Sequence, residues 1–331
     1  KNHTTQKYKA VCKVRSRVRF ALTGTPVENR LGELWSIFSF LMPGYLPPYK
    51  SFCSRFEKPI VQEEDQTAVR RLNQLTGPFI LRRMKSDVLK ELPPKTENVY
   101  RIELEEEQRK LYLAAVVDAR EKLQAAKPED KMAVFAVLMR LREICCDPRL
   151  IADNWEGGSA KLDACMELVT SAVEGGHRIL LFSQFTSMLE LLAKRLDAEG
   201  ISHFTLQGST PKPVRAELVR RFNGGEVSVF LISLRAGGTG LNLTAADIVI
   251  HYDPWWNVAA QNQATDRAYR IGQQNPVQVY KLIAQDTIEE KIVELQQAKQ
   301  SLADTVTGTA DGAILSMRPD DLLQLLEGSE P

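Results

Sequence analysis

The chain has 331 residues, of which 44% are hydrophobic and 26% charged, and its formal net charge is +1 at pH 7. This composition is typical of a globular protein with two or three domains, and no apolar run approaches the roughly 20 residues of a membrane span. The N-terminal segment lacks the apolar stretch of a secretory signal. The five cysteines include no C-x-x-C pair and the four histidines are scattered, which excludes a disulfide framework and a zinc site.

The first half of the chain predicts one strand followed by helices. Residues 17–26, "RVRFALTGTP", are typical of a strand that ends in a tight loop, and residues 31–44 of an amphipathic helix. From Pro47 to Ile151 the pattern is helical, broken by prolines, without strand alternation. Because one strand cannot form a sheet alone, we expect the chain to begin inside a domain whose remainder is missing.

The second half predicts a doubly wound α/β domain over residues 157–285. Apolar, β-branched runs alternate with helical segments, which favours a parallel sheet covered on both faces. A helix over 286–303, a linker and a short amphipathic helix within 304–331 are expected to follow. The predicted strands are 178–183, 203–206, 227–233, 247–252 and 277–283.

The stretch "QATDRAYRIGQ", residues 263–273, is a candidate phosphate site. If it continues a helix that starts near Asn257, then Gln263, Arg267 and Arg270 share one face. Two guanidinium groups aimed one way suit a polyphosphate, since each offers paired donors and keeps its charge. The alternative is a surface helix with an Asp266–Arg270 pair.

Polar loops are expected where the predicted strands end. "SLRAGGTGLNLTAAD" (233–247) follows a strand, and its glycines suit a phosphate of a nucleotide or of a nucleic-acid backbone, with a plain tight turn as the alternative. "LFSQF" (181–185) and "LQGSTP" (206–211) close two more strands with amide and hydroxyl groups. Such groups hold phosphates without reading bases. The basic stretch "MRLR" (139–142) is a local cluster of positive charge that suits a nucleic acid, with a solvated face or a strand edge as the alternative.

These segments and others occur in a characteristic order: "LTGTP" (22–26), "PFILRRMKSDV" (78–88), "LPPK" (92–95), "LMRLREICCDP" (138–148), "ILLFSQFTSMLELL" (179–192), "SLRAGGTGLNLTAADIVIHYDPWWN" (233–257) and "QATDRAYRIGQ". The order strongly resembles that of the SWI/SNF-type DNA-translocating ATPases of helicase superfamily two, over nearly the whole chain. The resemblance implies a fold with RecA-like α/β lobes. Its parts would be the end of the first lobe (1–45), helical protrusions with the inter-lobe linker (46–156), the second lobe or helicase C-terminal domain (157–285), a brace helix (286–303) and a linker with a short helix (304–331).

The resemblance also assigns roles to residues. Arg267 and Arg270 would be arginine fingers on ATP bound to the first lobe, with Gln263, Gly240 and Asp266 beside the nucleotide. Coupling of the lobes would fall to Thr23, Gly24 and Thr25. Contacts with the DNA backbone would come from Ser183, Gln184, Phe185, Gly208, Ser209, Arg215, Arg235, Gly237, Gly238 and Thr239.

Two family features are missing from the sequence. No G-x-x-x-x-G-K-[ST] and no D-E-x-[HQ] occurs, and "GGSAK" (157–161) has the wrong spacing for a phosphate loop. In the family a Ser-x-Lys of this kind opens the second lobe, and Lys-Asn follows the acidic box, so we expect this chain to begin just past that box. The implied cofactor, ATP with Mg²⁺, would be held mainly by the missing first lobe. The implied partners are that lobe and double-stranded DNA, bound by its backbone without sequence preference; no membrane is implied.

Other hypotheses stay open at this stage. The chain by itself is a candidate for a non-catalytic module that binds nucleic acid or a partner, because the phosphate cradle and its Mg²⁺ carboxylates are missing. A dinucleotide enzyme would need an acidic residue after the glycines, for which Asp253 is the candidate. The motifs do not separate duplex translocation from strand separation. We expect the cytoplasm or nucleoid of a bacterium, or the nucleus of a eukaryote.

Overall fold

The computed structural model describes residues 2–23, 31–63, 65–81, 83, 85, 89, 91–127, 130–234, 236, 240–296 and 319–327. The chain divides into two compact units, one of residues 1–88 with 296–314 and one of residues 89–295 with 315–331. Among the described residues, no helix is long and apolar enough to cross a membrane.

The first unit is helical where it is described. Its core packs the predicted helix α2 against later helices through buried Leu34, Phe38, Phe52 and Leu72. The helices are α1 (Gln6–Cys12), α2 (Leu31–Leu41), α3 (Tyr49–Phe52), α4 (Lys58–Gln62) and α5 (Gln66–Thr76), with a π-helical turn at Cys53–Glu57 and a 3-10 turn at Gly77–Phe79.

The strand expected over residues 17–26 is not formed in its described part, residues 17–23. This prediction was wrong, because no described strand lies beside the segment to accept its hydrogen bonds. Its apolar side chains are left in solvent, with Phe20 84% and Leu22 100% exposed. Gly24 and Thr25 lie outside the described residues.

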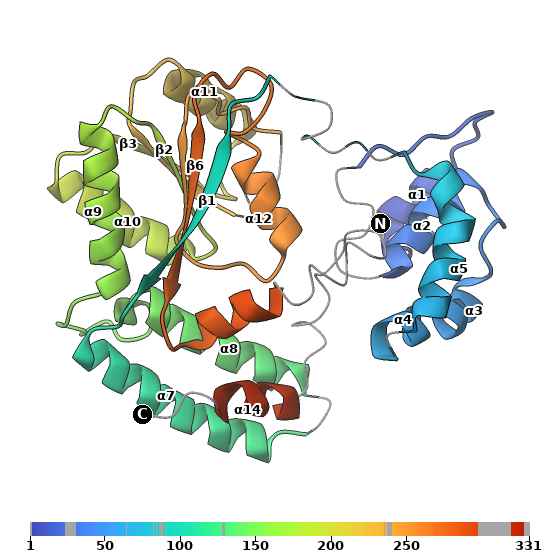
Figure 1. Ribbon diagram of the computed structural model, residues 1–331, viewed down its shortest axis with the longest axis horizontal. Helices are drawn as coiled ribbons and strands as arrows, with labels where there is room; N and C mark the ends of the chain where they lie inside the picture. Colours follow the sequence, from blue (N-terminus) through green and yellow to red (C-terminus); the bar gives the residue numbers. More distant parts are fainter. Residues whose placement is uncertain are drawn as a thin grey trace. The chain divides into compact units, whose positions relative to one another are not determined.

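The second unit is built on a parallel six-stranded sheet with the order β1-β6-β5-β2-β4-β3 (Figure 1). The α/β prediction is confirmed, and each of the strands predicted in the second half of the chain is present within a residue or two of its expected bounds. The strands are β1 (Lys95–Ile102), β2 (Ile179–Ser183), β3 (His203–Leu206), β4 (Val229–Ser233), β5 (Ile248–His251) and β6 (Val277–Ala284).

Strand β1 was missed, since residues 47–151 were expected to be helical throughout. It pairs with β6 at the edge of the sheet, and all its side chains except that of Ile102 are exposed. A strand of this kind carries charged and polar residues and lacks the apolar run that marks a buried strand. A cross-strand ion pair between Lys281 and Glu97 (2.8 Å) joins it to β6. The domain boundaries given above stay predictions.

Helices cover both faces of the sheet, as the apolar strands predict. Alternate residues of β2 point to opposite sides: Leu181 packs in the core with α9 (Ala160–Glu174) and α10 (Thr186–Ala198). Leu180 packs in the core that includes Phe222 of α11 (Lys212–Asn223) and Ala264 of α12 (Val258–Thr265). Figure 1 shows α9 and α12 on opposite sides of the sheet.

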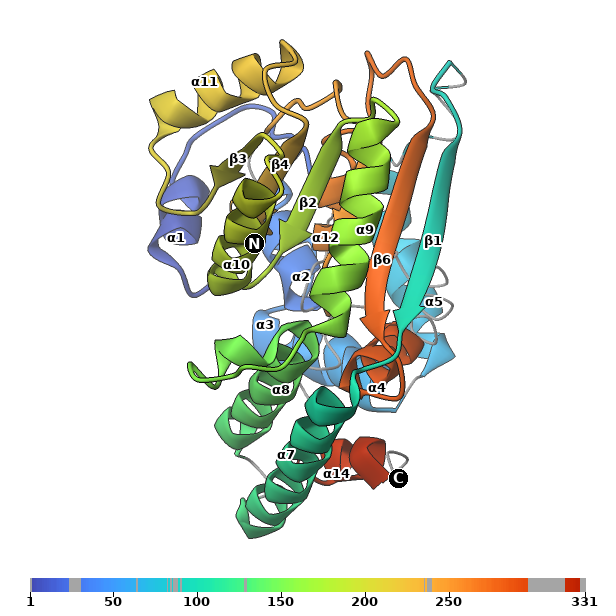
Figure 2. The same ribbon diagram turned by 90° about the vertical axis from the view of Figure 1, so that its left-hand side faces the viewer.

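A helical layer lies at one end of the sheet. The helices α7 (Glu106–Ala125) and α8 (Lys131–Cys146) lie side by side, and the 3-10 turn Pro148–Leu150 follows α8 (Figure 2). A further helix covers residues 288–296. The C-terminal helix α14 (Pro319–Glu327) packs on α7 and α8 and buries Leu322 and Leu326.

Candidate functional site

The predicted DNA-contacting segments are brought to one edge of the sheet. All strands are parallel, so the carboxyl ends of β2, β3, β4 and β5 meet at the same edge. Gln184 follows β2, Gly208 follows β3, and Asp253 follows β5. The fold therefore gathers the segments that were expected to form a polar rim. Arg235, Gly237, Gly238 and Thr239, in the loop after β4, lie outside the described residues.

The end of β2 is held from within the protein. Ser183 is fully buried, and its hydroxyl donates to Oδ1 of Asp253 at 2.6 Å. The same hydroxyl accepts from the backbone N–H of Phe185 at 3.1 Å, and the N–H of Gln184 donates to Asp253 at 3.2 Å. The hydroxyl of Ser183 is thus engaged inside the protein. Gln184 is partly exposed, but its side-chain Nε2 is buried and has no hydrogen-bond partner among the described residues.

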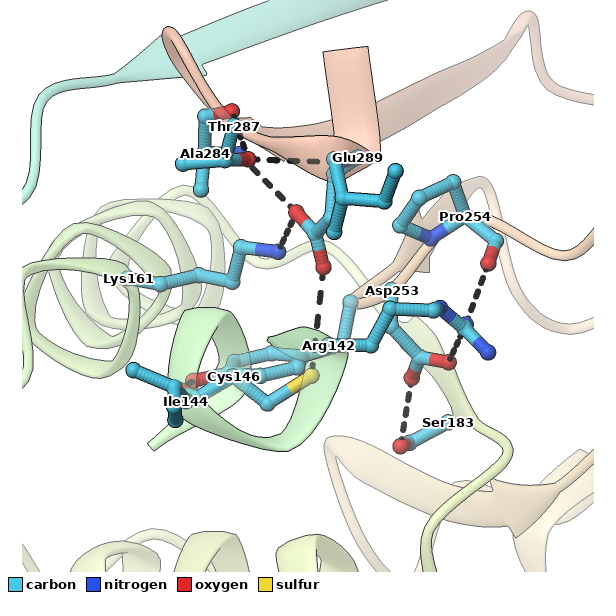
Figure 3. Close-up of polar contacts among 12 residues, drawn as sticks. Arg142, Ile144, Cys146, Lys161, Ser183, Asp253, Pro254, Ala284, Thr287 and Glu289 are labelled. Atoms are coloured by element: carbon cyan, nitrogen blue, oxygen red, sulfur yellow. Dashed lines mark hydrogen bonds and ion pairs between the residues drawn. The ribbon is translucent and has the colours of Figure 1, made fainter. Parts of the chain in front are cut away.

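Arg142 of α8 completes this arrangement. Its Nη2 donates to Oδ2 of Asp253 (3.1 Å) and to the carbonyl of Pro254 (2.5 Å), and neither charged side chain of the pair is exposed (Figure 3). Burial raises the pKa of Asp253, against the opposing effects of Arg142 and Ser183. Of the alternatives for residues 139–142, the solvated face is therefore excluded for Arg142, which is fully buried. The dinucleotide hypothesis also loses its acceptor, because Asp253 is fully engaged.

The loop after β3 is braced by a predicted DNA-contacting arginine. Arg215 of α11 donates from Nε to the carbonyl of Thr210 (2.7 Å) and from Nη2 to those of Gln207 (3.2 Å) and Gly208 (2.8 Å). Gly208 and Ser209 are exposed at the tip of this loop. Arg215 thus fixes the loop while the loop itself faces solvent.

The two candidate arginine fingers lie on a turn, not on a helix. Helix α12 begins at its cap Asn257, ends at Thr265, and is followed by turns through residues 266–270. The predicted helix to Arg270 was therefore too long. The backbone carbonyl of Arg267 accepts from the N–H of Leu243 (3.0 Å), a residue of the loop after β4, and the turn at this point allows that contact.

A second hydrogen bond joins the turn 266–270, here called the arginine turn, to the loop between β4 and β5, here called the glycine loop. Nη1 of Arg270 donates to the carbonyl of Leu241 at 3.1 Å. Gly240, which precedes Leu241, is exposed and has a φ of +51° that favours glycine. The loop that leads from β4 to β5 and the turn 266–270 therefore form one hydrogen-bonded unit, on the side of the sheet where β5 and β6 begin.

Arg267 is partly buried, and its charge has little compensation. Its pKa is lowered by burial first and by the nearby charge of Arg270 second, with Asp266 opposing. Its Nε is buried and has no hydrogen-bond partner within the part of the chain that is described. A guanidinium group with an unused buried donor beside a second cation fits an anionic group such as a phosphate.

Sequence reasoning missed two residues that hold the arginine turn. Gln273 is buried; its amide donates to the carbonyls of Ala246 (2.7 Å) and Ala268 (3.1 Å). His251, at the end of β5, has its Nε2 at 2.8 Å from the hydroxyl of Thr265, where α12 ends. Gln273 closes the "QATDRAYRIGQ" stretch, so the motif itself contained that signal. His251 is a single histidine in an apolar strand, and nothing in the sequence around it indicated a contact with Thr265.

Lys161 of "GGSAK" forms an ion pair with Glu289, and neither side chain is exposed. The carboxylate of Glu289 also accepts from the N–H of Ala284 at 2.9 Å (Figure 3). A lysine held in this way is not available to a phosphate, which agrees with the wrong spacing of the segment. Among the described residues, no group of three or more His, Cys, Asp or Glu side chains is placed to hold a metal ion.

A parallel six-stranded sheet with helices on both faces and polar loops at its carboxyl edge is the architecture of a RecA-like lobe. The family profile of the SNF2-related domain matches residues 1–150, and that of the helicase conserved C-terminal domain matches residues 160–272. The solved SWI2/SNF2 ATPase core of Sulfolobus solfataricus in complex with dsDNA is 34% identical, with a TM-score of 0.61 over 99% of this chain and 70% of that one. The chain belongs to the SWI2/SNF2 family of ATP-dependent helicases.

Curated relatives come from bacteria and animals. An uncharacterized ATP-dependent helicase of Mycoplasma genitalium is 39% identical over 99% of this chain and 31% of its own length. The human SWI/SNF-related matrix-associated actin-dependent regulator of chromatin subfamily A member 1 is 38% identical over 91% of this chain and 30% of its own length. The chain thus spans about a third of the length of these relatives.

Proposed function

We propose that this chain is the C-terminal part of an ATP-dependent motor that moves along double-stranded DNA. Its α/β lobe supplies contacts with the DNA backbone at the loops after β2, β3 and β4. Its arginine turn supplies fingers to ATP held by a first RecA-like lobe of the same protein. Thr23, together with Gly24 and Thr25, couples the two lobes.

The observation that carries this proposal is the double connection between the glycine loop and the arginine turn. One bond joins the N–H of Leu243 to the carbonyl of Arg267, and the other joins Arg270 to the carbonyl of Leu241. A shift of the loop against DNA therefore moves the backbone of one arginine and the side chain of the other. Coupling of this kind is what an ATPase stimulated by DNA needs.

The residues present fit the phosphates of ATP. Arg267 and Arg270 lie close enough for their charges to interact, and Arg267 has a buried donor without a partner in the described part of the chain. When bound, ATP with Mg²⁺ supplies the phosphoryl group and the counter-charge. The two arginines would stabilise the negative charge that develops on that group, an effect worth several orders of magnitude in rate.

The DNA contacts are proposed to be independent of sequence. Backbone N–H groups, amides and hydroxyls at the carboxyl edge bind phosphates and carry no information on bases. The described members of this surface are the exposed loop at Gly208 and Ser209 and the partly exposed Gln184, whose side-chain Nε2 is itself buried. The similar ATPase core of Sulfolobus solfataricus was solved in complex with dsDNA, which supports the choice of duplex DNA. Binding should weaken steeply with salt.

The test is DNA-stimulated ATP hydrolysis by the full-length protein that contains this chain. Arg267→Ala and Arg270→Ala should each lower the maximal rate by about 10³-fold or more. Arg220→Ala is the matched control, since Arg220 is exposed and paired with Glu217 on α11, away from the edge. Undiminished turnover in both finger variants would contradict the assignment.

For the 331-residue chain by itself, we propose a non-catalytic nucleic-acid-binding module. The sequence has neither the phosphate loop nor the acidic box, so nothing in it would hold ATP in line for attack. The measurement is ATP turnover of the chain with saturating duplex DNA, alongside DNA binding in the same preparation. Binding without turnover is expected, and a robust rate would contradict it.

A further inference from the structure

We propose that Asp253 is a positioning residue that fixes the strand end Ser183–Gln184–Phe185 and ties it, through Arg142, to helix α8. The inference deepens the proposed function and rests on it, since these three residues are among the proposed DNA contacts. Asp253 itself would touch neither DNA nor ATP.

One carboxylate organises three consecutive residues. Oδ1 of Asp253 accepts from the hydroxyl of Ser183 (2.6 Å) and from the N–H of Gln184 (3.2 Å). The N–H of Phe185 reaches the same group indirectly, because it donates to the hydroxyl of Ser183 (3.1 Å). The backbone direction at the end of β2 is therefore set by Asp253, two residues after the end of β5.

The other oxygen of this carboxylate connects to the helical layer. Nη2 of Arg142 donates to Oδ2 of Asp253 and to the carbonyl of Pro254, and Figure 3 shows both contacts. The guanidinium carbon of Arg142 also lies 4.6 Å from the ring centroid of Trp256 and 5.5 Å from that of Phe185. Arg142 thus touches the DNA-side strand end at Phe185 and the residues after β5 at once.

The energetics favour positioning over simple stabilisation. Asp253 and Arg142 are both fully buried, and a buried ion pair seldom stabilises a fold more than apolar side chains of the same volume would. Nε and Nη1 of Arg142 are, in addition, buried without a partner among the described residues. The burial of these charges costs free energy, so we infer that the pair serves to fix the position of α8 against the residues after β5. The two charges satisfy each other only when both segments are correctly placed.

Helix α8 follows α7 in the helical layer, and the proposed DNA contacts lie on the α/β lobe. The Asp253–Arg142 pair is therefore a direct polar link by which a displacement of α8 reaches the strand end at Ser183. Because Ser183 is itself buried, its contribution to DNA binding would be to aim Gln184 and the backbone.

The experiment measures ATP hydrolysis by the full-length protein as a function of DNA and, separately, of ATP. Asp253→Asn keeps the size of the side chain and removes the charge that holds Arg142. Arg142→Lys keeps the charge, but it lacks the longer reach of Nη2, which donates to both Asp253 and Pro254, and the planar group that lies over Phe185 and Trp256. Both should raise the DNA concentration for half-maximal stimulation, by about tenfold for Asp253→Asn, with the KM for ATP unchanged.

The matched control is Arg149→Met, because Arg149 forms an Arg–Asp pair with Asp147 just after α8. This pair makes none of the contacts at Ser183–Phe185, so the DNA response should not change. All assays are run well below the melting temperature of each variant, and Arg142→Lys is read alone if Asp253→Asn does not fold.

A double variant, Arg142→Met with Asp253→Leu, separates position from stability. Removing both charges should recover the melting temperature while the DNA response stays weak. The inference would be overturned if the double variant recovered both the melting temperature and the DNA response. It would also be overturned if the half-maximal DNA concentration and the KM for ATP changed by the same factor in the single variants. Absence of any DNA stimulation in the unsubstituted protein would instead refute the proposed function, and with it this role.

Discussion

Lys161 and Glu289 form an ion pair that is completely shielded from solvent, although they are far apart in sequence. Lys161 belongs to the first turn of α9, and Glu289 to the start of the helix over residues 288–296. Burial lowers the pKa of Lys161, but the attraction of the Glu289 carboxylate opposes this effect, and the pKa of Lys161 is raised. The pair joins the first helix of the α/β lobe to the helix that follows its last strand.

Substitution of Lys161 by alanine should destabilise the protein strongly. It leaves the carboxylate of Glu289 buried without its counter-charge, a change that typically costs about 3–5 kcal/mol. Lys110→Ala on α7, where the ion pairs with Glu106 and Glu107 are exposed and screened by water, should change the stability little. Urea unfolding of the protein measures both. A Lys161→Ala protein of normal stability that no longer binds ATP would instead indicate a phosphate-binding lysine.

Gln273→Leu should loosen the arginine turn. Leucine fills a similar volume, but it leaves the carbonyls of Ala246 and Ala268 without the donor that Gln273 supplies. Each unsatisfied carbonyl should lower the free energy of unfolding by up to about 3 kcal/mol. Because the turn carries Arg267, the maximal DNA-stimulated ATPase rate should fall more than the KM for ATP rises. Gln274→Leu, at the exposed neighbouring position, is the control, and equal losses in the two variants would argue against this role.

The buried strands and their order along the chain could be predicted because each is a continuous apolar run. The edge strand Lys95–Ile102 could not, since seven of its eight side chains are exposed and it has no such run. The residue at which α12 ends could not be predicted from the sequence either. Residues 257–270 have helical spacing, but the carbonyl of Arg267 accepts a hydrogen bond from the N–H of Leu243, which is distant in sequence.

In the candidate site, too, one part could be predicted from the sequence and another could not. Which residue types gather at the carboxyl edge follows from the alternation of strands and loops, so Gln184 and Gly208 were placed correctly on one edge. The residues that support them depend on contacts across the fold. Asp253 and Arg142 are 111 positions apart, and nothing local marks either as the partner of the other.

His251 should make the stability of the protein depend on pH. Burial first, and the charge of Lys281 second, lower its pKa from 6.5 to about 3, so the folded protein keeps this imidazole neutral where the unfolded chain protonates it. The unfolded state then binds the extra proton, and stability falls as the pH drops from 6.5 toward 3. Between pH 7 and pH 5 the loss is about 2 kcal/mol.

The measurement compares urea unfolding at pH 7 and pH 5. His251→Gln removes the titrating group, so the difference between the two pH values should shrink by about 2 kcal/mol relative to the unsubstituted protein. Thr265→Val is the control, because it removes the hydroxyl that contacts Nε2 but leaves the buried ring. An unchanged pH dependence in His251→Gln would show that the ring is solvated in the folded state.

The C-terminal helix α14 should depend entirely on its docking to α7 and α8. It has nine residues, fewer than the roughly 12 that an isolated helix needs in water, so packing must supply its stability. Leu322 and Leu326 are buried against the layer, and Arg120 of α7 donates to the carbonyl of Leu326 at 2.7 Å. Leu322→Asp places a charge in this contact and should release the helix. Amide hydrogen exchange over residues 319–327 should then reach the rate of an unstructured peptide, whereas Gln324→Asp, on the exposed side, should leave it slow; continued protection in Leu322→Asp would mean that other contacts hold α14 in place.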